Sequence, residues 1–163
     1  MPTPNDVIVH SLTATRQMLL GFVEDLTPQE YLHRPAPKVN CAAWLLGHLT
    51  PTDRRIMSTC LDATDLPPLP DGFDKRFSRD EGGPQADEFG DVTGLAPLFA
   101  SHRDLLIETV RSADPTTLDQ PFPTRHPRFK TVGEAVSFMS VHTAMHAGQI
   151  SVIRRSLGRP PLI

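Results

Sequence analysis

The chain has 163 residues, 39% of them hydrophobic and 21% charged, which is long enough for a buried core and fits one domain over residues 1–163. Its net charge of −3 gives no electrostatic reason to expect nucleic acid or an anionic membrane as a partner. No apolar run approaches the roughly 20 residues that span a bilayer, and the N-terminal segment lacks the pattern of a secretory signal, so we expect no membrane association.

The two cysteines do not predict a disulfide. Cys41 and Cys60 fall on one predicted helix, where about 1.5 Å per residue separates them by roughly 28 Å, far beyond disulfide reach. We therefore expect a reducing, cytoplasmic location. The arginines are scattered rather than massed, and we interpret them mostly as solvated helix faces: Arg16, Arg54, Arg55, Arg103 and Arg154.

The 17 prolines cluster between the periodic apolar segments, which indicates helices separated by stiff connections. The first predicted helix covers residues 5–26 and turns His10 toward solvent. Its apolar residues recur at helical spacing: Ile8, Leu12, Leu19, Phe22, Val23 and Leu26. The stretch TPQE at 27–30 then predicts the start of a short helical turn.

The second predicted helix covers residues 40–61, with Asn40 as its N-cap. Pro51 lies inside it and is expected to kink or break it early. His48 lies on the edge of its apolar stripe, a position that suits a side chain facing a cleft. Residues 62–93 show no clear periodicity, and a connection of this length is typical of a lid, a binding loop or a disordered segment.

The third predicted helix covers residues 94–112, with His102 near the centre of its apolar stripe. A second irregular connection, 113–130, carries the basic and aromatic stretch TRHPRFK. A capping box of Thr131 and Glu134 opens the last helix, which runs to residue 157 with Gly158 as its C-terminal cap. Four amphipathic helices without a convincing strand predict an all-α fold, a four-helix bundle with long irregular connections.

The last predicted helix contains the sequence HTAMHAGQI at 142–150. His142 and His146 lie four residues apart and fall inside the helix's apolar stripe, so both imidazoles face the bundle interior. Two imidazoles at this spacing can converge on one metal ion, as in zinc helices with an HExxH motif. Here Thr143 stands where that motif has its glutamate, so the spacing comes without the general base.

An alternative interpretation is that these are two core histidines bonded to backbone, hydroxyl groups or water. Chance alone gives about 0.3 histidine pairs at this spacing in such a sequence, so the spacing does not decide between the two. Three observations favour a metal: both positions are central in the stripe, His48 faces inward from another helix, and few buried carboxylates offer themselves as partners.

Three histidine ligands would leave a position on the ion open, which is the catalytic rather than the structural arrangement. Such ligands need hydrogen-bond acceptors that fix their tautomers. Gln149 follows His146 by one turn on the same face and is the candidate in the sequence, with an ordinary polar helix residue as the alternative.

The stretch NCAAWLLGHL at 40–49, together with HTAMHAGQISVIRRSLG at 142–158, resembles the DinB-like (damage-inducible) metalloprotein superfamily. The family's proteins are helical bundles with a WxxxH-type motif on the second helix and HxxxHxGQ on the last. YLHRP before the second helix and the terminal GRPP are also similar to the family. The resemblance covers most of the chain in order, with the long connections as the unmatched parts.

The resemblance implies a divalent metal, zinc or nickel, held by His48, His142 and His146. It also implies that homodimers are common. Characterised relatives include thiol transferases and isomerases that use a low-molecular-weight thiol as cosubstrate, and others are assigned as hydrolases. The family name reflects stress induction and does not imply DNA binding.

Other residues have weaker claims on the site. His102 could add a fourth ligand, although a satisfied core histidine is the better interpretation. Cys41 lies two turns before His48 and could be a soft ligand, but a small buried residue fits it better. Asp53 and Glu134 would serve as bases only if the fold brought them near the metal.

Within the second connection, His126 with Arg125 and Arg128 could bind the anion of a substrate or thiol at the mouth of the site. A solvated loop is the more common meaning of such a charge run. His33 precedes Arg34 and Pro35 in a turn and is expected to face water.

The function that the sequence favours is a metal-dependent enzyme that activates a small thiol for attack on an electrophilic small-molecule substrate. The alternatives are a hydrolase that uses metal-bound hydroxide and a non-catalytic stress protein that binds a metal or small ligand. No catalytic residue is identified beyond the three candidate metal ligands.

Overall fold

The computed structural model describes residues 1–78, 86–160 and 162. Its four long helices are α1 (Pro4–Val23), α3 (Ala42–Cys60), α5 (Leu95–Ser112) and α6 (Val132–Ser156). Between them lie α2 (Pro28–Tyr31), α4 (Phe73–Arg76) and 3-10 turns at Ala86–Glu88, Val92–Gly94 and Pro115–Thr117. Apart from one isolated bridge between Pro121 and Thr131, no β-structure forms in these ranges, which confirms the all-α bundle.

Threonine capping boxes start three of the helices. Thr3, Thr27 and Thr131 each accept a hydrogen bond from the backbone N–H three residues later, while the acidic side chain there bonds back to the threonine N–H. The boxes at Thr27 and Thr131 were both predicted. Helix α1 ends at Val23, three residues before the predicted end, because the chain must straighten to enter the next capping box.

Helix α3 differs from its prediction at two points. Its N-cap is Cys41, whose backbone is extended and whose side chain makes no capping bond, so Asn40 as N-cap was wrong. Pro51 does not break the helix, which runs on to Cys60. The hydroxyls of Thr50 and Thr52 donate to the carbonyls of Leu46 and His48 on either side of the gap that proline leaves in the hydrogen-bond ladder.

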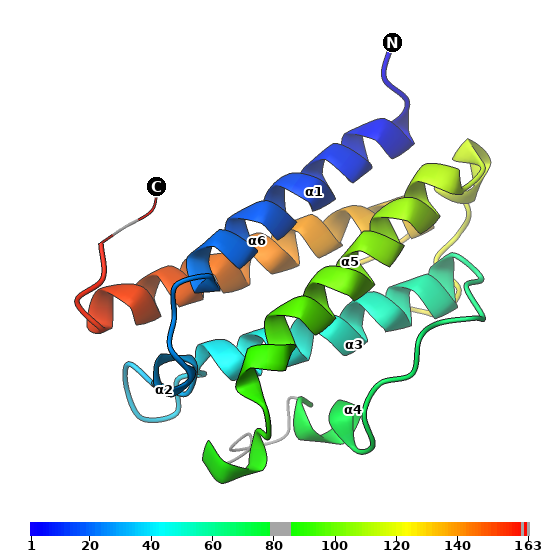
Figure 1. The fold of residues 1–163 in the computed structure, drawn as a ribbon. Helices are drawn as coiled ribbons and strands as arrows, with labels where there is room; N and C mark the ends of the chain where they lie inside the picture. The colour runs from blue at the N-terminus through cyan, green and yellow to red at the C-terminus, as the bar shows by residue number, and fades with distance from the viewer. Residues whose placement is uncertain (79–85, 161, 163) are drawn as a thin grey trace.

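The long helices form a bundle in which neighbours alternate between parallel and antiparallel (Figure 1). Helices α1 and α6 run side by side in one direction, and α3 and α5 run together in the other. Helix α1 also packs on α5, and α3 packs on α6. Because α3 and α5 are parallel, the chain must travel back along the bundle between them, which explains the length of that connection. Within the described residues, no helix is long and apolar enough to cross a bilayer.

The connection between α3 and α5 is partly ordered and packed. Four side chains of this connection are buried in the hydrophobic core around the start of α3. They are Phe73 in α4, Phe77 directly after it, and Phe89 and Val92 further along the chain. Of the three alternatives predicted for residues 62–93, a disordered segment is therefore wrong for these parts. Residues 79–85 of that segment lie outside the described residues.

The interior consists of two hydrophobic clusters with a polar layer between them. Each long helix passes from one cluster to the other at mid-length, between the following pairs: Leu12 and Leu19, Leu49 and Ile56, Phe99 and Leu106, Met139 and Ala147. The residues between these pairs include most of the buried polar side chains: Asp53, His102, Arg103, His142, Thr143 and His146.

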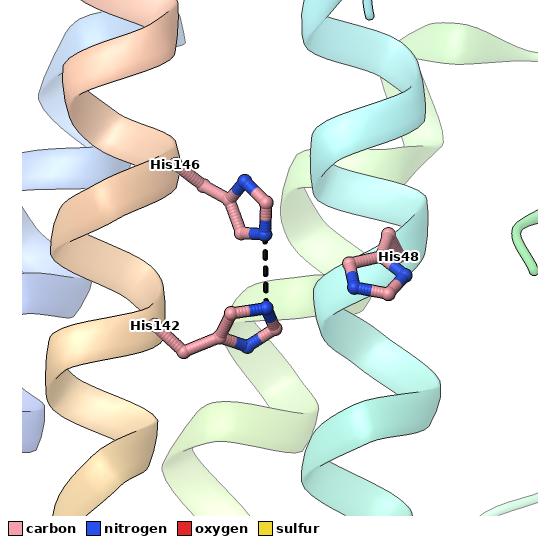
Figure 2. A group of neighbouring side chains, drawn as sticks. All are labelled: His48, His142 and His146. Atoms are coloured by element: carbon pink, nitrogen blue, oxygen red, sulfur yellow. Dashed lines mark hydrogen bonds between the residues drawn. The ribbon is translucent and has the colours of Figure 1, made fainter. Parts of the chain in front are cut away.

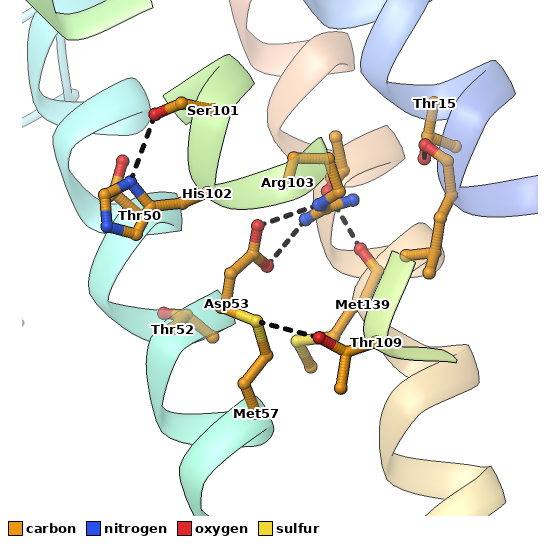
Figure 3. Close-up of polar contacts among 12 residues, drawn as sticks. Thr15, Thr50, Thr52, Asp53, Met57, Ser101, His102, Arg103, Thr109 and Met139 are labelled. Atoms are coloured by element: carbon orange, nitrogen blue, oxygen red, sulfur yellow. Dashed lines mark hydrogen bonds and ion pairs between the residues drawn. The ribbon is translucent and has the colours of Figure 1, made fainter. Parts of the chain in front are cut away.

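An ion pair lies in this polar layer (Figure 3). Arg103 of α5 donates two hydrogen bonds of 2.8 Å to the carboxylate of Asp53 on α3, and neither side chain is exposed. Burial raises the pKa of Asp53, while the neighbouring Arg103 and His102 oppose that shift. The prediction that Arg103 lies on a solvated helix face was therefore wrong. The same prediction was wrong for Arg154, which is buried and paired with Asp25 of the α1–α2 connection.

We predict that Asp53→Ala lowers the free energy of unfolding by about 3–5 kcal/mol, because it leaves the Arg103 guanidinium buried without a counter-charge. Urea denaturation followed by circular dichroism measures the loss. A double variant, Asp53→Leu with Arg103→Met, should recover most of it by replacing both charges with apolar groups.

The control is Asp104→Ala, which removes the partner of Arg16 in an exposed pair and should cost no more than about 1 kcal/mol. Equal losses for Asp53→Ala and Asp104→Ala would show that the buried pair has no special role.

Candidate metal centre

Three histidine side chains meet at the polar layer between α3 and α6 (Figure 2). His142 and His146 project from successive turns of α6, and His48 lies across from them on α3. All three are buried, with exposed fractions of 7% for His48, 4% for His142 and 5% for His146. One nitrogen from each lies within 4.8 Å of the other two, so the group could hold a metal ion.

The two histidines of α6 direct their Nε2 atoms toward each other. Their Nε2 atoms are 2.9 Å apart. In a tetrahedral zinc site with Zn–N bonds of about 2.0–2.1 Å, two ligand nitrogens lie about 3.3 Å apart, so only a small separation of these rings is needed to admit an ion.

Gln149 fixes the orientation and the tautomer of the His146 ring. The Nδ1 atom of His146 lies 2.7 Å from Oε1 of Gln149, and an N–H at Nδ1 is the group that can donate to an amide oxygen. That bond assigns the lone pair of His146 to Nε2, the atom that faces His142. Gln149 therefore takes the orienting position that was one of its two predicted alternatives.

His48 is oriented from the α3–α5 connection. Its Nδ1 atom lies 3.2 Å from the backbone carbonyl of Phe77, which can only accept a hydrogen bond, so the lone pair belongs to Nε2. One face of the His48 ring is covered by Trp44, whose ring stacks on it with centroids 4.7 Å apart and an interplanar angle of 7°.

Phe77 can approach α3 because residue 47 is glycine. A Cβ atom at Gly47 would lie 2.2 Å from Cδ1 of the Phe77 ring, which is much closer than any non-bonded contact allows. Sequence reasoning missed both residues. A backbone carbonyl has no side-chain signature, and a glycine within a helix can be recognised as a contact point only when its neighbour is known.

His102 and Cys41 do not join the three-histidine group. His102 is buried on α5 and donates from Nδ1 to its own helix at the Leu98 carbonyl, 2.9 Å away. Cys41 is buried at the start of α3, and burial raises the pKa of its thiol, which disfavours the thiolate that a metal needs. Cys41 follows the interpretation that the sequence favoured. His102 is a core histidine as predicted, but it is satisfied only at Nδ1, because its buried Nε2 atom has no hydrogen-bond partner among the described residues.

The two acidic candidates are also engaged elsewhere. Asp53 is held by Arg103, and the Glu134 carboxylate accepts hydrogen bonds from the backbone N–H groups of Lys130 and Thr131 at the start of α6. Both carboxylates therefore already have hydrogen-bond partners outside the three-histidine group.

A cleft of about 1290 Å³ opens beside the histidines, and His48 and His142 form part of its lining. One wall comes from α3, including Thr52, Arg54 and Arg55. A further part of the lining comes from the second connection and the first turns of α6, and it includes Phe122, His126, Arg128, Phe129 and Phe138. His126 and Arg128 thus line the cleft, as the anion-binding alternative for this segment requires, although a solvated loop was the favoured interpretation. Arg125 does not line the cleft.

Comparison with protein-family models matches residues 11–150 to the DinB superfamily. The match covers most of the chain and includes both the His48 and the His142–His146 motifs, so the chain belongs to the DinB superfamily. No curated protein and no solved structure matches the chain. Family membership and the buried histidine group together fit a metal-binding protein.

We predict that Gly47→Ala lowers metal affinity, by about 10–100-fold, because the added methyl group displaces Phe77 and removes the carbonyl that orients His48. Competition with a chromogenic chelator measures the affinity. Gly21→Ala on α1 is the matched control, since its Cβ would meet no atom within 4 Å. Unchanged affinity in a folded Gly47→Ala protein would contradict the orienting role of Phe77.

Proposed function

We propose that His48, His142 and His146 bind one divalent ion, zinc or nickel, and that the protein is a metal-dependent enzyme that transfers a small thiol to an electrophilic substrate. The observation that carries this proposal is the convergence of the three buried imidazoles beside a large cleft. Two of them have their second nitrogen on an oxygen acceptor, as metal-ligating histidines do. The donor set of three neutral nitrogens suits zinc and nickel.

When bound, such an ion supplies Lewis acidity that favours the deprotonated form of a thiol or a water at its open position. The chain's own contribution is positional. Gln149 and the Phe77 carbonyl fix the tautomers of His146 and His48, and Trp44 and Phe138 cover the imidazoles of His48 and His142 with flat apolar surface. These ring contacts support the two imidazoles, and the cleft that His48 and His142 line gives reactants access to the group.

The thiol route is favoured over hydrolysis by the engagement of Asp53 and Glu134 in other bonds. A free thiol loses its proton near pH 8.5, whereas bulk water has a pKa of about 15.7, so a thiol needs much less help from a general base. Hydrolysis by an activated water and non-catalytic metal binding are the alternative functions. A cytoplasmic location and a homodimer remain predictions.

We expect the purified protein to contain about one zinc or nickel ion per chain, measured by elemental analysis. His48→Ala, His142→Ala and His146→Ala should each lose most of the metal. His102→Ala is the matched control, because it removes a histidine that is equally buried but outside the group. Full metal content in His142→Ala, or a wild-type protein that folds without metal and does not take it up, would overturn the ligand assignment.

The metal-loaded protein should consume a model electrophile such as monochlorobimane only when a low-molecular-weight thiol is added. It should leave p-nitrophenyl acetate unchanged, because ester hydrolysis needs an activated water instead. Turnover of the ester without thiol would instead support the hydrolase. If the fully metal-loaded protein is inactive in both assays, the result would support a non-catalytic binding protein.

A further inference from the structure

The cleft beside the histidines has a wall of aromatic rings in continuous contact. His126 stacks on Phe129 with ring centroids 4.5 Å apart and an interplanar angle of 5°. Phe129 contacts Phe138 at 5.3 Å, and Phe138 stacks on His142 at 6.1 Å. The wall thus leads from the exposed second connection directly to one of the three histidines, and it offers an aromatic, apolar surface to whatever lies against it.

Cationic groups border this wall. The guanidinium of Arg128 lies over the Phe138 ring, 4.8 Å from its centroid, and Arg55 lines the same cleft from α3. A guanidinium that lies on a ring face keeps its in-plane N–H donors for a carboxylate. In the part of the chain that the structure describes, neither Arg55 nor Arg128 forms an ion pair.

The balance of charge in the cleft is opposite to that of the chain. Among the described residues that line it, Arg54, Arg55 and Arg128 stand against one carboxylate, that of Asp74, with His126 as a further basic group. Arg54 is occupied in part, since it donates to the carbonyl of Pro67. The chain as a whole carries a net charge of −3, so this cleft concentrates positive charge on an acidic protein.

We propose that the electrophilic substrate is a planar, apolar carboxylate, whose flat body lies against the aromatic wall and whose carboxylate binds Arg128, with Arg55 as a second cation in the same cleft. This inference rests on the proposed function, because it names the second reactant of that same site. The cleft volume of about 1290 Å³ exceeds the range of roughly 300–1,000 Å³ that is usual for one small ligand. It therefore leaves room for a thiol beside this substrate.

The test is a calorimetric titration with cinnamate and with its neutral analogue cinnamamide, on both zinc-loaded and chelator-stripped protein. Cinnamate should bind about tenfold or more tightly than cinnamamide, because only the acid forms charge-assisted hydrogen bonds with Arg128. Arg128→Gln should remove this preference in both metal states and leave the affinity for cinnamamide nearly unchanged. Arg125→Gln is the matched control, because it removes a neighbouring exposed arginine that does not line the cleft.

Equal affinities for the acid and the amide, or equal effects of Arg128→Gln and Arg125→Gln, would overturn the proposal. The proposal would also fail if cinnamate bound only to the zinc-loaded protein and its affinity were the same in Arg128→Gln. The carboxylate would then be a ligand of the metal. Arg128-dependent binding in a protein that never takes up metal would refute the proposed function and leave the carboxylate subsite standing.

Discussion

The structure depends on placing polar side chains at the middle of a helical bundle, where each buried polar group needs a partner. All four long helices interrupt their apolar stripes at the same level, and the polar layer they form there contains both the Asp53–Arg103 pair and the histidine group. The ion pair fixes α3 against α5 on one side of this layer, and the imidazoles join α3 to α6 on the other. A shift of α3 along its axis would separate both sets of partners, so the layer links the register of the helices to the geometry of the site.

The order of the helices explains how the site is completed. Parallel α3 and α5 require a long return connection, and the chain uses this return to bring Phe77 against α3 at Gly47. The aromatic ring closes the core, while the carbonyl of the same residue orients His48. One residue therefore couples the packing of the connection to the tautomer of a candidate ligand. A connection of a kind that is usually free to vary is therefore constrained here by its contact with the site.

Helical periodicity was sufficient to identify the residues whose positions depend only on local geometry. Because α6 is a regular helix, the phase of His142, His146 and Gln149 could be calculated from their spacing, and the three residues do share one region. His48 was found from its place at the edge of a stripe and from the family resemblance. The bundle followed from four amphipathic segments, and two helix starts followed from capping boxes that use only neighbouring residues.

Features that depend on contacts between distant segments could not be found in this way. Arg103 has no local sign that separates a buried arginine from a solvated one, because its partner lies fifty residues earlier in the chain. Pro51 interrupts the hydrogen-bond ladder of α3 without ending the helix, since the turns on either side are already held in the bundle. The N-cap of α3 depends on the backbone angles at Cys41, which the preference for asparagine at such positions does not determine.

The net charge of the chain does not reveal this cleft, for a related reason. A value of −3 averages over the whole surface, but a small ligand responds to the field inside one cleft, which its low-dielectric walls concentrate. Helical spacing brings Arg55 to the same side of α3 as His48, while Arg128 arrives from a segment without periodicity. Both arginines line one cleft because the second connection folds back over the start of α6, where Phe129 packs on Phe138. The anion recognition that we propose for this acidic protein is therefore a property of its tertiary fold, and its net charge contains no sign of it.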